Sequence, residues 1–83
     1  MPYKTWHDPK AASAVDKAVA AHIKARRIAL GLSQMQVADK IGVAYQQIHK
    51  YENGLNRLSV GRLAQMVRAL EMRGEDFLPY LNR

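Results

Sequence analysis

The residues best suited to polar recognition lie close together, between positions 44 and 50. Gln46 and Gln47 each carry an amide that donates and accepts hydrogen bonds, which matches the N6/N7 edge of adenine. Lys50 follows one helical turn later and can donate to guanine O6 and N7. The methyl group of Ala44 and the ring of Tyr45 can pack on a thymine methyl group. The same residues also suit an ordinary solvated helix face, so the surrounding elements must decide between the two interpretations.

Residues that perform catalysis or hold metals are scarce in this sequence. It contains no cysteine, which excludes disulfides, a thiol nucleophile and a cysteine-ligated zinc site. His7, His22 and His49 share no metal-ligand spacing, and His49 with Glu52 lacks a third ligand. There is also no glycine-rich loop that would cradle a phosphate. We therefore predict that the protein is not an enzyme and uses no metal or cofactor.

The charge of the chain favours a polyanionic partner. Thirteen Lys and Arg against seven Asp and Glu give a net charge of +6, and residues 1–31 carry most of the excess. Nucleic acid and an anionic membrane surface are both possible partners. A membrane-surface protein is the poorer hypothesis, because the basic groups do not lie opposite a bulky apolar face. The sequence has no apolar run of the roughly 20 residues that are needed to span a bilayer. Its first residues also lack the apolar run of a secretory signal.

Helix-start and helix-stop signals divide the 83 residues, which suffice for one domain, into an arm and five short helices. Residues 1–12 are predicted to be the arm, because Pro2 and Pro9 lack a backbone donor. The helices are expected over residues 14–30, 34–41, 45–53, 60–70 and 75–78. Residues 13–83 would then form one all-α domain with tight connections.

Capping residues support these boundaries. Ser13, Ser33 and Ser59 stand where N-caps are needed, and Gln36 completes a capping box with Ser33. Gly31 is a good residue to follow a helix, because glycine takes the left-handed conformation without a Cβ penalty. The predicted apolar face of the second helix consists of Met35, Val37, Ala38 and Ile41.

Two of these helices, joined by a short turn at Gly42, have the outline of a helix-turn-helix over about residues 33–53. Ala38 lies where the helices would cross, and a larger side chain there would push them apart. Gly42 needs a positive φ in the turn. Ile48 returns from the second helix to pack under both. Together, within a capped helix pair, the three residues are a specific signal.

At this point the sequence resembles the Cro/phage-repressor-type (XRE-family) helix-turn-helix proteins over about residues 24–78. The matching segments are Gly31-Leu32-Ser33-Gln34, Val37-Ala38, Ile41-Gly42-Val43, Ile48, Tyr51-Glu52-Asn53-Gly54 and Leu70. The resemblance implies a compact five-helix bundle whose third helix enters the DNA major groove. Residues 44–47 and Lys50 are then the base-reading candidates, because the front of such a helix points into the groove. Ala44 departs from the Ser or Thr frequent in relatives, which leaves the start of this helix open.

The resemblance also implies residues that contact the DNA backbone and residues that hold the helices together. Gln34, Asn53 and Arg57 are the main phosphate candidates, and Ser33 and Arg62 are further ones. Arg27 and Glu52 are expected to form a largely buried ion pair and not to contact DNA. Lys24 and Arg26 lie on other faces of their helix and are expected to attract DNA at long range.

Both ends of the chain leave alternatives open. The segment Tyr3-Lys4-Thr5-Trp6-His7 could reach the minor groove, pack on the bundle or be disordered. The resemblance implies that the C-terminal tail, residues 74–83, packs on the bundle or dimerises. Its candidate dimerisation residues are Phe77, Leu78, Tyr80 and Leu81.

The resemblance predicts a sequence-specific, double-stranded DNA-binding transcriptional regulator, a repressor that binds an inverted-repeat operator as a homodimer. It implies a cytoplasmic, nucleoid-associated protein encoded by a bacterium or phage. The alternative, motivated by the apolar tail, is the antitoxin of a toxin–antitoxin pair, which binds a toxin protein and autoregulates its operon.

Overall fold

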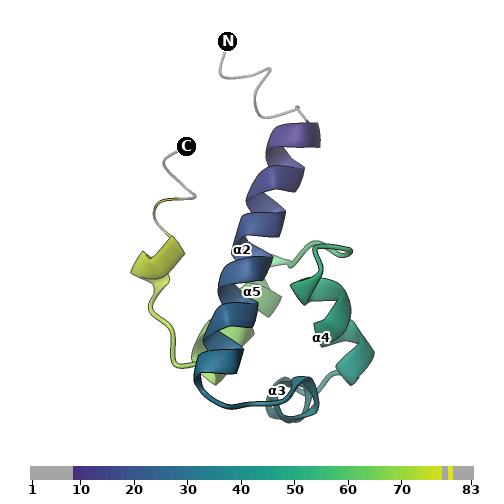
Figure 1. Cartoon of the computed structure of the whole chain (residues 1–83), viewed down its shortest axis with the longest axis vertical. Coiled ribbons are helices and arrows are strands. Elements are labelled where there is room, and N and C mark those ends of the chain that lie inside the picture. Colours follow the sequence, from purple (N-terminus) through teal and green to yellow (C-terminus); the bar gives the residue numbers. More distant parts are fainter. Residues whose placement is uncertain (1–8, 78, 80–83) are drawn as a thin grey trace.

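The computed structural model describes residues 9–77 and 79, with side chains from Ala14 onward. Helices are labelled as in Figure 1 and are α2 (Pro9–Ala29), α3 (Gln34–Ile41), α4 (Tyr45–Glu52) and α5 (Val60–Ala69). A 3-10 turn, η1 (Gly74–Phe77), follows them. The described residues contain no strand, and the predicted all-α class is confirmed. Where a fifth helix was predicted over 75–78, the described residues form the four-residue 3-10 turn Gly74–Phe77, and residue 78 lies outside the described part of the chain.

The first helix begins at Pro9 and not at residue 14. A proline fits the first turn of a helix, because its missing N–H has no intrahelical partner there and its φ is already helical. Residues 9–12, which the sequence assigned to the arm, therefore extend α2, and Ser13 lies inside the helix and is not its N-cap. Residues 1–8, including the segment Tyr3 to His7, lie outside the described part of the chain.

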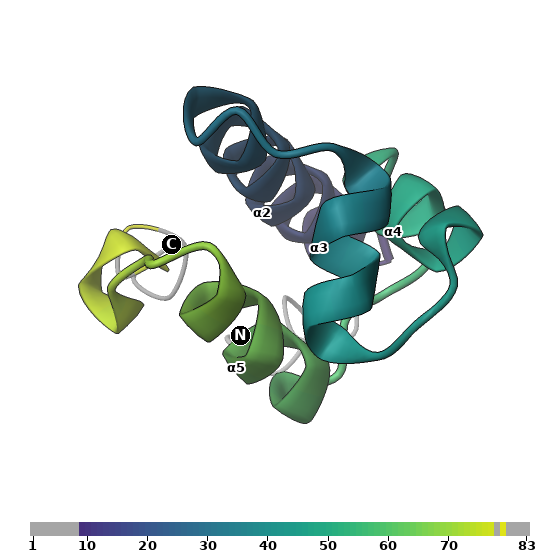
Figure 2. The ribbon, with the colours of Figure 1, turned by 90° about the horizontal axis from the view of Figure 1, so that it is seen from below.

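The long helix α2 supports the shorter helices (Figure 1). Seen from below, α3 lies between α4 and α5 (Figure 2). Accordingly, α3 packs against both α4 and α5, and α4 also packs against α2. The helix pair α3–α4 is thus held from two directions.

Each of the four helices, together with η1, contributes to the hydrophobic core. The buried side chains are Ile23, Val37, Ala38, Ile48, Tyr51, Met66, Leu70 and Phe77. Burial of each large aliphatic side chain among them stabilises the fold by about 1.5–3 kcal/mol. Phe77 is 7% exposed, and its ring lies against that of His22, with 5.4 Å between the ring centroids and a tilt of 37°. Phe77 thus takes the packing alternative within its own chain, whereas dimerisation through the tail stays a prediction, because Leu78, Tyr80 and Leu81 lie outside the described residues.

The predicted turn signals have their expected geometry. Ser33 and Gln36 form the reciprocal capping box of α3, and Ser59 caps α5 by accepting from the Arg62 N–H at 3.0 Å. Gly31 and Gly42 have φ of 71° and 74°, in the left-handed region.

One residue that was predicted to belong to the apolar face of α3 is instead exposed. Met35 is 62% exposed, whereas Val37 and Ala38 are buried. Two residues correspond to more than half a helical turn, so Met35 points away from Val37.

Candidate nucleic-acid interface

Helix α4 divides sharply into a buried and an exposed face. Ile48, Tyr51 and Glu52 are at most 7% exposed and face the core and α2. Of the predicted base-reading residues, Tyr45 is 47% exposed, and Ala44, Gln46 and Lys50 are also exposed. Gln47 is half-buried. The front of α4 therefore presents polar side chains to solvent, while its back anchors the helix.

The N-terminus of α4 carries no side-chain cap. Ala44 has the extended backbone of an N-cap residue, with φ −71° and ψ 147°, but makes no side-chain hydrogen bond to the first turn. This places the start of the helix at Tyr45. Backbone N–H groups at such an end carry the positive pole of the helix dipole and attract anions.

The turn between α3 and α4 sets the direction of the exposed helix. The N–H groups of Gly42 and Val43 both donate to the Ala38 carbonyl, at 2.8 and 3.0 Å. Ala38 is 2% exposed, so no larger side chain fits at this crossing without displacing α4.

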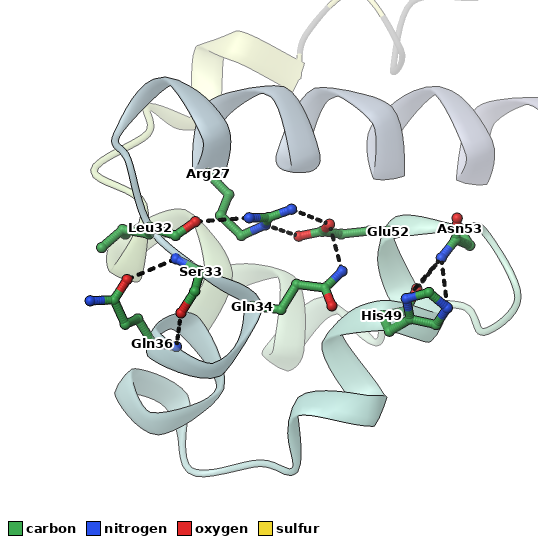
Figure 3. A network of polar contacts seen from close by, with 8 residues as sticks. All are labelled: Arg27, Leu32, Ser33, Gln34, Gln36, His49, Glu52 and Asn53. Carbon is green, nitrogen blue, oxygen red and sulfur yellow. Dashed lines mark hydrogen bonds and ion pairs between the residues drawn. The ribbon is translucent and has the colours of Figure 1, made fainter.

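A polar network joins α2, α3 and α4 behind this surface (Figure 3). The Arg27 guanidinium donates to both carboxylate oxygens of Glu52, at 2.6 and 3.0 Å, and to the Leu32 carbonyl at 2.8 Å. The two side chains are 12% and 1% exposed. The ion pair expected from the resemblance is thus present in bidentate form, and it ties α4 to α2.

Gln34 belongs to the same network. Its amide nitrogen donates to Glu52 Oε1 at 3.1 Å (Figure 3). The sequence placed Gln34 among the phosphate contacts, and the structure gives it a second task, which is to tie α3 to α4. The amide nitrogen has one further hydrogen, so a phosphate contact by Gln34 stays a prediction.

The other phosphate candidates are spread over several elements. Asn53 is exposed, and its amide nitrogen donates to the His49 carbonyl at 2.8 Å. Arg57 pairs with Asp16 of α2 at 3.0 Å. Arg62 donates to Gln65 at 2.9 Å, and the Ser33 hydroxyl accepts from the backbone of Gln36. These contacts connect each candidate to its own neighbours and do not by themselves gather the set into one patch.

Arg26 has a role that the sequence analysis missed. Its guanidinium donates to the carbonyls of Leu70 and Glu71, at 3.0 and 3.3 Å, and so caps the C-terminal end of α5. The contact leaves the positive charge of Arg26 in place, so its long-range attraction of DNA stays a prediction. No local pattern signals it, because its partners lie 44 and 45 residues away in the chain.

Neither a metal cluster nor a membrane span is found in the part of the chain that the structure describes. No group of three or more His, Cys, Asp or Glu side chains could hold a metal ion there. None of its helices is both long and apolar enough to cross a bilayer.

Comparison with known proteins agrees with this geometry. A family model described as helix-turn-helix matches residues 23–77, which include α3, α4 and the turn between them. The chain belongs to this helix-turn-helix family. The Cro/C1-type resemblance recognised in the sequence is confirmed.

Relatives of this helix-turn-helix chain carry names of transcriptional regulators. One from Rhodospirillum rubrum, named an uncharacterized transcriptional regulator in the ATPase CF(0) region, is 44% identical over 83% of this chain and 64% of its own. An uncharacterized HTH-type transcriptional regulator of Sinorhizobium fredii is 42% identical over 78% of this chain and 46% of its own. The chain thus spans between about half and two thirds of the length of these relatives. Their names describe regulators and not enzymes, as predicted for this chain.

A solved structure shares the fold. A mutant of the restriction-modification controller protein C.Esp1396I superposes with a TM-score of 0.72 over 81% of this helix-turn-helix chain and 85% of that protein. The sequences are 24% identical, so this likeness concerns the fold alone.

Proposed function

We propose that this protein is a sequence-specific, double-stranded DNA-binding transcriptional repressor that acts as a homodimer in the bacterial cytoplasm, on the nucleoid. The observation that carries the proposal is the outward display of Tyr45, Gln46 and Lys50 on a helix whose opposite face is buried. A helix with solvated polar residues at its front and an anchored back can enter the major groove without unfolding its own support.

Within this proposal, base recognition falls to the front of α4. Gln46 would form the bidentate amide contact with an adenine, and Lys50 would reach a guanine one turn further on. Gln47 is half-buried and has less room to move, so we assign it a smaller part in base recognition than Gln46. Each good bidentate contact discriminates against a wrong base by about 1–3 kcal/mol.

Backbone contacts would come from the residues that flank α4. Asn53, Arg57 and Gln34 would bind phosphates and fix the position of the helix, while Ser33 and Arg62 would add weaker contacts. Such contacts carry no sequence information and make binding fall steeply with salt.

A homodimer would place two copies of α4 on one face of the duplex. The expected operator is an inverted repeat whose half-sites are about 10–10.5 base pairs apart, one turn of B-DNA.

Selection of bound sequences from a random duplex pool tests the proposal. The expected result is an enriched inverted repeat with half-sites one helical turn apart. The selected duplex should outcompete random duplex at physiological salt by about 10³-fold or more. Equal competition by random duplex would refute sequence-specific recognition.

The described residues do not test the alternative, an antitoxin that binds a toxin protein. It was motivated by the apolar tail, and the one candidate dimerisation residue the structure describes with its side chain, Phe77, packs inside the protein. We therefore do not propose it as a second function.

A further inference from the structure

The loop between α4 and α5 is held against α2 at two neighbouring positions. Gly54 has φ 67°, and a Cβ built on it would lie 3.0 Å from the Lys17 Cγ atom, so the loop backbone nearly touches α2. Next to Lys17, Asp16 pairs through Oδ2 with Nε of Arg57 at 3.0 Å. One turn of α2 thus meets both the beginning and the later part of this loop.

The geometry of the ion pair leaves the phosphate-binding end of Arg57 available. The contact uses Nε, and 71% of the Arg57 side chain remains exposed. Arginine has five N–H donors in a planar fork, so a guanidinium bound at one edge still offers donors to a phosphate. An arginine side chain without such a contact would lose up to about 2 kcal/mol of rotamer entropy when DNA ordered it.

We propose that Asp16 is a positioning residue for DNA binding, which holds the Arg57 guanidinium oriented for a phosphate before DNA arrives. This inference rests on the proposed function, in which Arg57 contacts the DNA backbone. Asp16 lies on α2, outside the helix-turn-helix. Its carboxylate also repels DNA, so the two effects oppose each other; the proposal states that orientation prevails.

A double-mutant cycle on Asp16 and Arg57 tests the proposal. The probe is a labelled, mixed-sequence duplex of about 24 base pairs at about 50 mM salt, where phosphate contacts dominate the affinity. Asp16→Ala should weaken binding by about three- to fivefold, in keeping with the modest energy of an exposed ion pair. Asp16→Asn should retain most of the affinity, because its amide oxygen can still accept from Arg57. In an Arg57→Ala background, Asp16→Ala should have no weakening effect.

Asp39→Ala is the matched control, because Asp39 is an exposed carboxylate on α3. Its removal should only strengthen binding slightly, through the loss of one negative charge. Thermal unfolding of every variant shows whether it is folded at the temperature of the binding measurement.

The possible failures are distinguishable. No binding of the duplex by the wild type would contradict the proposed function itself. Unchanged affinity of Arg57→Ala would refute the phosphate contact while DNA binding stands. Tighter binding of Asp16→Ala, or equal weakening with and without Arg57, would refute positioning by Asp16.

Discussion

Helices α3 and α4 are both eight residues long, yet they are stabilised in different ways. At the front of α3, Ser33 and Gln36 satisfy each other's backbone groups, at 2.8 and 3.0 Å. At the front of α4, Ala44 provides no side-chain cap. Instead, α4 is anchored from behind by Ile48 and Tyr51 in the core and by Glu52 in the ion pair with Arg27.

This difference in how the two helices are stabilised explains why α3 can support its neighbours while α4 exposes its first turn. A helix with its own cap is stable at its end and can serve as a platform, as α3 does between α4 and α5 (Figure 2). A helix that is held by its buried face needs no side-chain cap at its first turn. An anion or a base edge can then bind there. The start of α4 thus depends on tertiary contacts, whereas the start of α3 depends on its local sequence.

The largest effect is expected from removal of the buried carboxylate. Glu52→Ala should destabilise the fold by about 3–5 kcal/mol, because it leaves the Arg27 charge nearly buried without its partner. Denaturant unfolding measures this loss. Replacing both residues, as Arg27→Met with Glu52→Met, should cost less than the single change, and exposed Lys24→Ala should stay within about 0.5 kcal/mol of the wild type. A single-variant loss below about 1 kcal/mol would show that α4 is not held by this pair.

The next effect concerns the exposed front of α4 and changes binding without changing stability. Gln46→Ala should remove about 1–3 kcal/mol of discrimination at one base pair of the selected operator. Its unfolding free energy should stay within about 0.5 kcal/mol of the wild type, because the side chain is exposed. Competition binding with single-base-pair variants of the operator measures the first quantity. Gln65→Ala on α5 is the control and should preserve base preference; a selective loss there, and none at Gln46, would contradict the assignment.

The cap of α3 should contribute a smaller amount. Ser33→Ala is expected to cost about 1 kcal/mol, because it removes the acceptor for the Gln36 N–H and opens the capping box. Ser59→Ala is the matched comparison, since Ser59 caps α5 with a single hydrogen bond from Arg62. Chemical denaturation should give a greater loss for Ser33 than for Ser59. The reverse order would indicate that α3 does not depend on its local cap.

The smallest effect is a gain of stability at the start of α4. Ala44→Ser should stabilise the protein by about 0.5–1 kcal/mol, because a hydroxyl supplies the cap that alanine lacks. Thermal and denaturant unfolding measure the gain. The Gln47 N–H already donates to the Ala44 carbonyl at 3.0 Å. No gain would mean that this bond suffices at the start of α4, and the contrast between the two helices would then be weaker.

Much of the fold was predictable because its signals are local. The starts of α3 and α5 follow from Ser33 and Ser59, and the ends of α2 and α3 follow from glycines with positive φ. The start of α2 was not predicted, because proline is both a helix breaker and a good first residue, and only the surrounding structure distinguishes the two.

The candidate site was predicted less completely. The exposed front of α4 agrees with the residues expected to read bases, but those base contacts stay a proposal. The Arg27–Glu52 pair came from the resemblance and is present. By contrast, Gln34 bonded to Glu52 and Arg57 bonded to Asp16 required knowledge of which helices lie side by side.

By itself, the sequence determined the helical class, the helix-turn-helix outline and the polar front of one helix, since caps, turns and apolar spacing act within a few residues. Only the tertiary structure decided that Phe77 belongs to the core, that Arg26 caps α5, and that Asp16 meets Arg57. These contacts join groups that lie far apart in the chain, and their partners are set by how whole helices pack.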